Sequence, residues 1–168
     1  MVGVVASAEL IDGTAVRAGD ALIGLPSSGL HTNGYTLARR ILPEETWDQP
    51  MPDASESIGD ALLRPHRSYL DEVRLLRPAM RAEGGDLRAL AHITGGGIPG
   101  NLVRILPEGC QALVDPTSWD LPPLFTTLQQ AGGISTEEMR DVFNLGIGYC
   151  AVVSEPGDAL VIGRIERA

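Results

Sequence analysis

Three short segments of the chain combine glycine with polar side chains, a pattern typical of a backbone that approaches a ligand. The first segment lies between an apolar stretch and a helical one, where free backbone amides and the positive end of a helix would bind an anion. Its candidate binding residues are Ser27, Ser28, Gly29, Asn33 and Gly34. An ordinary strand-to-helix turn with capping side chains fits this segment equally well.

Histidine accompanies two of the segments. His31 lies inside the first and could act as a charged donor or a general acid-base, because the pKa of histidine is near neutrality. His92 opens the second segment, in which consecutive glycines cost conformational entropy unless a ligand or an unusual backbone angle needs them. We favour a phosphate cradle or lid here over a loose surface hairpin, although His92 could be a buried, hydrogen-bonded histidine. The candidate binding residues of this segment are Thr94, Gly95, Gly96 and Gly97.

The third segment follows a predicted helix and opens a predicted strand. Asn144 could take the left-handed conformation at the helix end, with Gly146 and Gly148 beginning the strand. Its amide could instead point into the same cleft as the other two segments, and the residues alone leave both readings open. His66, which follows Arg64 and Pro65, is interpreted as a structural or surface residue.

Composition excludes several classes of function. The 168 residues suit one domain over residues 1–168, and a net charge of −9 argues against a nucleic-acid partner. All 13 basic residues are arginine, which excludes a lysine Schiff base or a phosphate-loop lysine in this chain. Cys110 and Cys150 lack zinc-site spacing and are expected in the core, so we predict no metal ligands. No apolar run is long enough to cross a membrane, and we expect a cytoplasmic location.

Hydrophobic periodicity and turn residues predict alternating strands and helices. A polar, proline-rich loop is expected over residues 43–57, and Ser135 with Glu138 forms a predicted capping box. This interleaving predicts an α/β (α+β) domain with a mixed β-sheet covered by helices. Strands are predicted over residues 2–9, 21–26, 87–93, 111–114, 147–153 and 160–165, and helices over 35–42, 67–80, 99–105, 121–130 and 135–144.

The three segments together resemble the C-terminal-domain motifs of the phosphoribosylformylglycinamidine cyclo-ligase family, also called aminoimidazole ribonucleotide synthetases. The resemblance runs from Gly3 to Ile165, and the order and spacing of its pieces make it specific. It implies the C-terminal half of a two-domain enzyme. The family's N-terminal domain, absent from residues 1–168, carries the dimer interface and the acidic residues that bind metal for ATP. The motifs lie at residues 25–35, 91–97 and 143–148, with further matching pieces at 63–69, 104–107 and 161–165.

The resemblance implies an ATP- and Mg²⁺-dependent ring closure on a ribonucleotide substrate, formylglycinamidine ribonucleotide, by a homodimer in the full-length enzyme. The formyl oxygen would be activated as a phosphoryl ester, attacked by an amidine-side nitrogen and released as phosphate. His31 is the first candidate for proton transfer and His92 the second. We expect the chain alone to be inactive. The family usually has a helix between its last two strands, where this sequence has only residues 154–158.

Other readings remain open from the sequence. Related ATP-using enzymes share the layout: formylglycinamidine ribonucleotide synthetase, selenophosphate synthetase and thiamine-monophosphate kinase. A stand-alone ribonucleotide- or phosphate-binding module, and a purely structural partner subunit, are alternatives from different functional classes.

Overall fold

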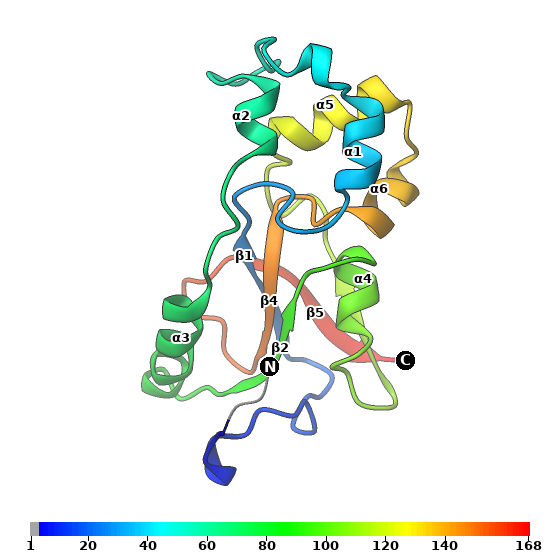
Figure 1. The fold of residues 1–168 in the computed structure, drawn as a ribbon. Coiled ribbons are helices and arrows are strands. Elements are labelled where there is room, and N and C mark those ends of the chain that lie inside the picture. Colours follow the sequence, from blue (N-terminus) through cyan, green and yellow to red (C-terminus); the bar gives the residue numbers. More distant parts are fainter. Residues whose placement is uncertain (1–3) are drawn as a thin grey trace.

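The computed structural model describes residues 4–168, whose five strands form one sheet in the order β2-β4-β1-β5-β3 (Figure 1). All four pairings are antiparallel. The α+β class is therefore confirmed, but the sheet is antiparallel rather than mixed. β1 and β2 run in the same direction, yet β4 lies between them and pairs with both. The strands are β1 Ala21–Pro26, β2 Leu87–His92, β3 Cys110–Val114, β4 Ile147–Val153 and β5 Val161–Arg167.

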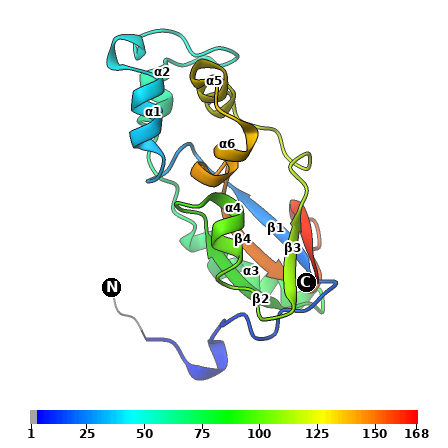
Figure 2. The same cartoon turned by 90° about the vertical axis from the view of Figure 1, so that its right-hand side faces the viewer.

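The helices fall into two sets. α1, α2, α5 and α6 gather beyond one end of the sheet and are called the helix group here, whereas α3 and α4 lie alongside the sheet (Figures 1 and 2). The helices are α1 Tyr35–Ile41, α2 Ile58–Leu62, α3 Leu70–Ala82, α4 Gly97–Leu102, α5 Pro123–Gly132 and α6 Thr136–Val142, with 3-10 turns η1 Ser7–Glu9 and η2 Glu44–Thr46.

The buried apolar residues form three clusters, one on each face of the sheet and one within the helix group. β1 is buried on both faces, as predicted: Leu22 packs on one side with α4, and Ile23 packs on the other with Met80 of α3. The helix group closes over a separate cluster that contains Phe125 and Phe143. Burial of one large apolar side chain contributes roughly 1.5–3 kcal/mol to the free energy of folding. The helix group is therefore stabilised by a core of its own.

Several local expectations differ from the structure. The predicted strand at residues 2–9 is wrong, because Ser7–Glu9 forms a 3-10 turn; Met1–Gly3 lie outside the described residues. The helix α2 was not anticipated, although Ser57 and Asp60 form a capping box at its start. At α6, Ser135 Oγ accepts a hydrogen bond from the Glu138 amide at 3.1 Å, which is one half of the predicted capping box.

The cysteines, the connection between β4 and β5 and the lengths of the helices can also be compared with the predictions. Cys150 is buried and Cys110 half-buried, and both are free thiols. Residues 154–160 join β4 to β5 without the helix that the resemblance implied, although β1 lies between these two strands. None of the helices within residues 4–168 combines the length and apolar character needed to span a membrane.

Candidate functional site

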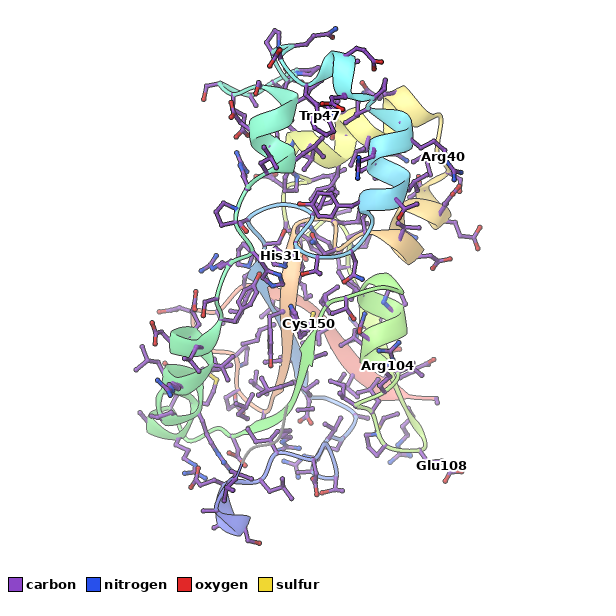
Figure 3. The ribbon with its side chains drawn as sticks, in the orientation of Figure 1. His31, Arg40, Trp47, Arg104, Glu108 and Cys150 are labelled. Carbon is purple, nitrogen blue, oxygen red and sulfur yellow. The ribbon has the colours of Figure 1, made fainter. Side chains whose placement is uncertain are left out.

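Sheet topology explains why the three glycine-bearing segments meet. Pro26 at the end of β1 pairs with Ile147 at the start of β4, and His92 at the end of β2 pairs with Tyr149 of the same strand. The segments that follow β1 and β2 and the one that precedes β4 therefore gather at one end of the sheet. This end faces the helix group, and His31 lies at the junction between the two (Figure 3).

Asn144 holds the first segment in place. Its Oδ1 accepts hydrogen bonds from Ser27 Oγ and the Gly146 amide, both at 2.9 Å, and its Nδ2 donates to the carbonyls of Gly29 at 2.8 Å and Leu30 at 3.2 Å. The amide is thus buried and fully used within the protein. Asn144 is not left-handed as one reading predicted; that conformation belongs to its neighbour Leu145, with a φ of 52°.

A second asparagine holds the glycine loop, Gly95–Gly97. Asn101 on α4 accepts from Thr94 Oγ1 at 3.0 Å and donates to the carbonyls of Thr94 at 3.2 Å and Gly97 at 2.7 Å. Its side chain is buried. Asn101 was not among the residues predicted from the sequence, although a lone polar residue beside Ile98 and Leu102 in an apolar helical turn is a signal for such a role.

The glycines of the first two segments have different roles. Gly97 has a φ of +60°, and a Cβ there would collide with the carbonyl oxygen of Arg140. A Cβ at Gly34 would overlap the ring of Phe143. Both glycines therefore let chain segments pack together. Within the described chain, the exposed amides of Gly95 and Gly96 have no protein acceptor, so these two remain available to a ligand.

The imidazole of His31 is buried at the centre of the site, with 7% of the residue exposed. Its Nε2 accepts a hydrogen bond from the Ser28 amide at 3.2 Å, which places the ring proton of the neutral form on Nδ1. That Nδ1 is buried and has no partner. The backbone of His31 is left-handed, with a φ of 64°. The ring thus pins the turn at Ser28 and is closed off from solvent.

Gly148 on β4 makes this packing possible. A Cβ at this position would collide with the hydroxyl of Tyr69 and with the His31 ring. Tyr69 in turn donates its hydroxyl to the carbonyl of Pro26 at 3.0 Å and lies 3.4 Å from His31 Nε2. In the third segment, Gly148 therefore helps to place His31 because it has no side chain, and not because it binds a ligand.

His66 and His92 lie on the exposed side of His31. The ring of His66 stacks on that of His31, with centroids 4.0 Å apart and an angle of 13° between the planes. The Nε2 atoms of His66 and His92 lie 3.2 Å apart. His31, His66 and His92 are called the histidine cluster here. The interpretation of His66 as a surface residue holds for its exposure, but the structure places it inside the candidate site.

Burial and nearby positive charge disfavour the protonated forms of His31 and His92. Burial lowers the pKa of His31 from 6.5 to about 4, and the positive charges of His66, His92 and Arg67 add to this effect. Burial also lowers the pKa of His92, with a further contribution from His66. The pKa values of Tyr69 and Tyr149 are raised by burial, so both hydroxyls stay protonated.

The cluster raises the question of a metal ion. Three ring nitrogens, one from each histidine, lie within 4.8 Å of one another, a set that imidazole-binding metals use. However, the rings of His31 and His66 lie in nearly parallel planes, so lone pairs in those planes do not converge on one ion. In addition, His31 Nε2 already accepts a hydrogen bond from the Ser28 amide. This geometry suits hydrogen bonding and proton exchange better than joint metal ligation. The expectation of no metal ligands stays a prediction.

Two pockets border these residues. A shallow pocket of about 350 Å³ takes His92 from the histidine cluster and is lined by Tyr69, Leu70, Val73, His92 and Tyr149. A smaller one of about 130 Å³ lies on the other side of the turn, where Ser27, Ser28 and Gly29 meet α5 and Arg64. The structure therefore brings His31 and His92 together but turns the two serines toward a separate hollow.

Acid should destabilise this domain through His31. Because the folded-state pKa of His31 is about 4 and the unfolded value is 6.5, the unfolded chain binds more protons between these values. The free energy of unfolding should therefore fall as the pH drops from 6.5 to 4. Urea titrations across this range would measure the slope, with His31→Asn as the comparison. An equally steep slope in the variant would assign the loss to other groups.

Comparison with known proteins agrees with this architecture. The family described as AIR synthase related protein, C-terminal domain, matches residues 17–166, and the chain belongs to this family. The chain is 50% identical over 155 residues to a phosphoribosylformylglycinamidine cyclo-ligase of Parasynechococcus marenigrum, covering 90% of this chain and 44% of that protein. It is 45% identical over 152 residues to one of Desulfitobacterium hafniense, covering 90% and 43%.

A plant relative extends the match. The chain is 41% identical over 168 residues to the chloroplastic phosphoribosylformylglycinamidine cyclo-ligase of Arabidopsis thaliana, which covers 99% of this chain and 42% of that protein. The chain thus spans less than half the length of these relatives.

Proposed function

We propose that this chain is the C-terminal portion of an ATP-dependent cyclo-ligase that converts formylglycinamidine ribonucleotide to aminoimidazole ribonucleotide in purine biosynthesis. The observation that carries the proposal is the convergence of all three motif segments at one end of the sheet, around the histidine cluster. The relatives reported above bear the cyclo-ligase name, and not the names of the alternative ATP-using enzymes. A cytoplasmic homodimer remains part of the proposal.

On this proposal, backbone amides and a histidine ring would contact the ribonucleotide. Thr94 and the free amides of Gly95 and Gly96 would receive a phosphate of the ribonucleotide, because unpaired backbone amides bind anions. His92, exposed beside the shallow pocket, would contact the reacting part of the substrate. His31 would hold the turn behind it. This reverses the ranking made from the sequence, because both nitrogens of His31 are buried or already bonded.

The remaining residues would shape the site. Ser27, Gly29 and Asn144 join the first turn to the third segment through hydrogen bonds, and Gly34 admits the ring of Phe143. Ser28 contributes its amide to His31, while its hydroxyl donates to the carbonyl of Pro65 at 2.7 Å. Asn33 lies across from Gly95, at the opening of the glycine loop. Gly97 packs against α6.

The donors present do not fit Mg²⁺. That ion prefers carboxylate and water oxygens in octahedral geometry, whereas the candidate site offers imidazole nitrogens, tyrosine hydroxyls and amides. On this proposal, Mg²⁺ and the triphosphate of ATP bind mainly to the other portion of the enzyme, and this chain supplies the wall that holds the ribonucleotide.

Reconstitution tests the proposal. The purified chain should bind formylglycinamidine ribonucleotide in calorimetry but show no ATP-dependent imidazole formation. Adding the separately expressed N-terminal portion of a relative should restore turnover. The same mixture made with the His92→Gln chain is the matched control and should turn over much more slowly. Turnover by the lone chain at the rate of a complete cyclo-ligase, or activity only with substrates of the alternative enzymes, would contradict the proposal.

A further inference from the structure

His66 makes a polar contact at each ring nitrogen, although it is exposed. Its Nδ1 lies 2.9 Å from Thr32 Oγ1, and its Nε2 lies 3.2 Å from Nε2 of His92. Its flat face rests on the ring of His31. An ordinary exposed side chain rarely has contacts at both ring nitrogens and on one face of its ring. This residue is therefore placed by its surroundings.

The short separation between the two Nε2 atoms restricts where protons can lie. Two lone pairs at 3.2 Å would repel, and so would two N–H groups, so one hydrogen lies between the rings when both are neutral. Thr32 permits either arrangement, because its hydroxyl can donate to His66 Nδ1 or accept from it. Either histidine can thus donate the hydrogen between the rings without any change in the positions of heavy atoms, provided that both rings change tautomer and their remaining protons exchange at Nδ1.

The groups around the pair do not supply a competing charge. From the first segment His31 faces it, and from β4 Tyr149 stacks on His92 at an angle of 22°. Tyr69 packs against His31 and His92, and Arg67 on the same connection pairs with Glu72 of α3. No carboxylate among the described residues makes a hydrogen bond or ion pair with His66 or His92. An added proton on the pair would be shared between the two imidazoles rather than neutralised by an acid.

We propose that His66 and His92 form a proton-sharing pair, in which His66 is the positioning residue that sets the protonation state of His92 at the shallow pocket. The pair can leave His92 Nδ1 as an acceptor or as a donor: Nδ1 is an acceptor when His92 Nε2 holds the shared hydrogen, and it carries the ring's own proton when His66 Nε2 holds it. A single added proton is stabilised by the N–H···N bond, whereas a second is opposed by charge repulsion at this distance. The role toward substrate rests on the proposed function, but the pairing itself does not.

Nuclear magnetic resonance of the ring nitrogens tests the pairing in the chain itself, without any nucleotide. In the parent protein, His66 and His92 should titrate together in two steps about 1 pH unit or more apart. His66→Phe keeps a ring to stack on His31 but removes both nitrogens. In this variant His92 should titrate in one step, at a pH between the two steps of the pair.

Ser68→Ala, a change in the same exposed connection that leaves both rings in place, is the matched control and should retain the two-step curve. Circular dichroism would confirm that the variants fold, and the parent curve alone decides the matter if His66→Phe does not. Independent one-step titration of both histidines in the parent, or a His92 curve that His66→Phe leaves unchanged, would overturn the proposal. Because no turnover is measured, a failure here would be distinct from a failure of the cyclo-ligase assignment.

Discussion

Replacing Gly97 by alanine is expected to lower the free energy of unfolding by roughly 2–5 kcal/mol, which combines the cost of a left-handed alanine with that of overpacking. The backbone at Gly97 has a φ of +60°, and a Cβ there would collide with the carbonyl of Arg140 at the end of α6. Either the glycine loop or α6 must move. Urea denaturation of the parent and variant chains would measure the loss.

Gly95→Ala is the matched comparison, two residues away in the same loop. Its Cβ would have room, since the nearest atom is Asn33 Nδ2 at 3.5 Å. We expect a change in stability within about 0.5 kcal/mol, as for ordinary surface substitutions, but weaker binding of the ribonucleotide if a phosphate lies against this amide. Equal destabilisation by the two substitutions would contradict the assignment of Gly97 to packing and of Gly95 to ligand binding.

His31→Ala is expected to lower kcat/KM of the reconstituted enzyme by roughly 10²-fold, the size of effect that a misplacement of about 1 Å can cause. Alanine leaves the Ser28 amide without its acceptor and removes the ring on which His66 stacks. The turn would lose its shape and the exposed histidines their support. Steady-state kinetics of the two-part enzyme would measure the change.

His31→Asn distinguishes a positioning role from a chemical one. Asparagine tolerates the left-handed backbone found at this position, and its side-chain oxygen can accept a hydrogen bond from the Ser28 amide. Because both nitrogens of His31 are withdrawn from solvent, we expect His31→Asn to recover most of the activity lost in His31→Ala. An asparagine variant as impaired as the alanine variant would show that the imidazole itself takes part in the reaction.

Local sequence signals predicted most of the fold. The apolar run of β1 and the alternation of strands and helices correspond to elements of the structure, since each is encoded by contiguous residues. The mistakes have local causes too. The strand expected at residues 2–9 has an apolar start, but residues 4–9 pair with no strand of the sheet.

The candidate site was predictable only in part. Its glycine segments could be recognised because each is a compact motif, whereas the residues that organise it depend on contacts across the chain. His66 reaches the site through a connection 26 residues before His92, and nothing in the sequence around it indicates that partner. The orientation of Asn144, with its amide turned inward to Gly29 and Leu30, likewise follows only from how β1 and β4 pair.

The central position of β1 has a consequence for how the protein is made. β1 spans Ala21–Pro26, yet both of its partners, β4 and β5, lie beyond residue 146. During synthesis, a strand that is apolar on both faces must therefore remain without neighbours until residues 147–167 have left the ribosome. Folding dominated by such distant pairings is slow, and an unpaired apolar strand invites aggregation. We therefore expect the folding of this domain to depend on chaperones.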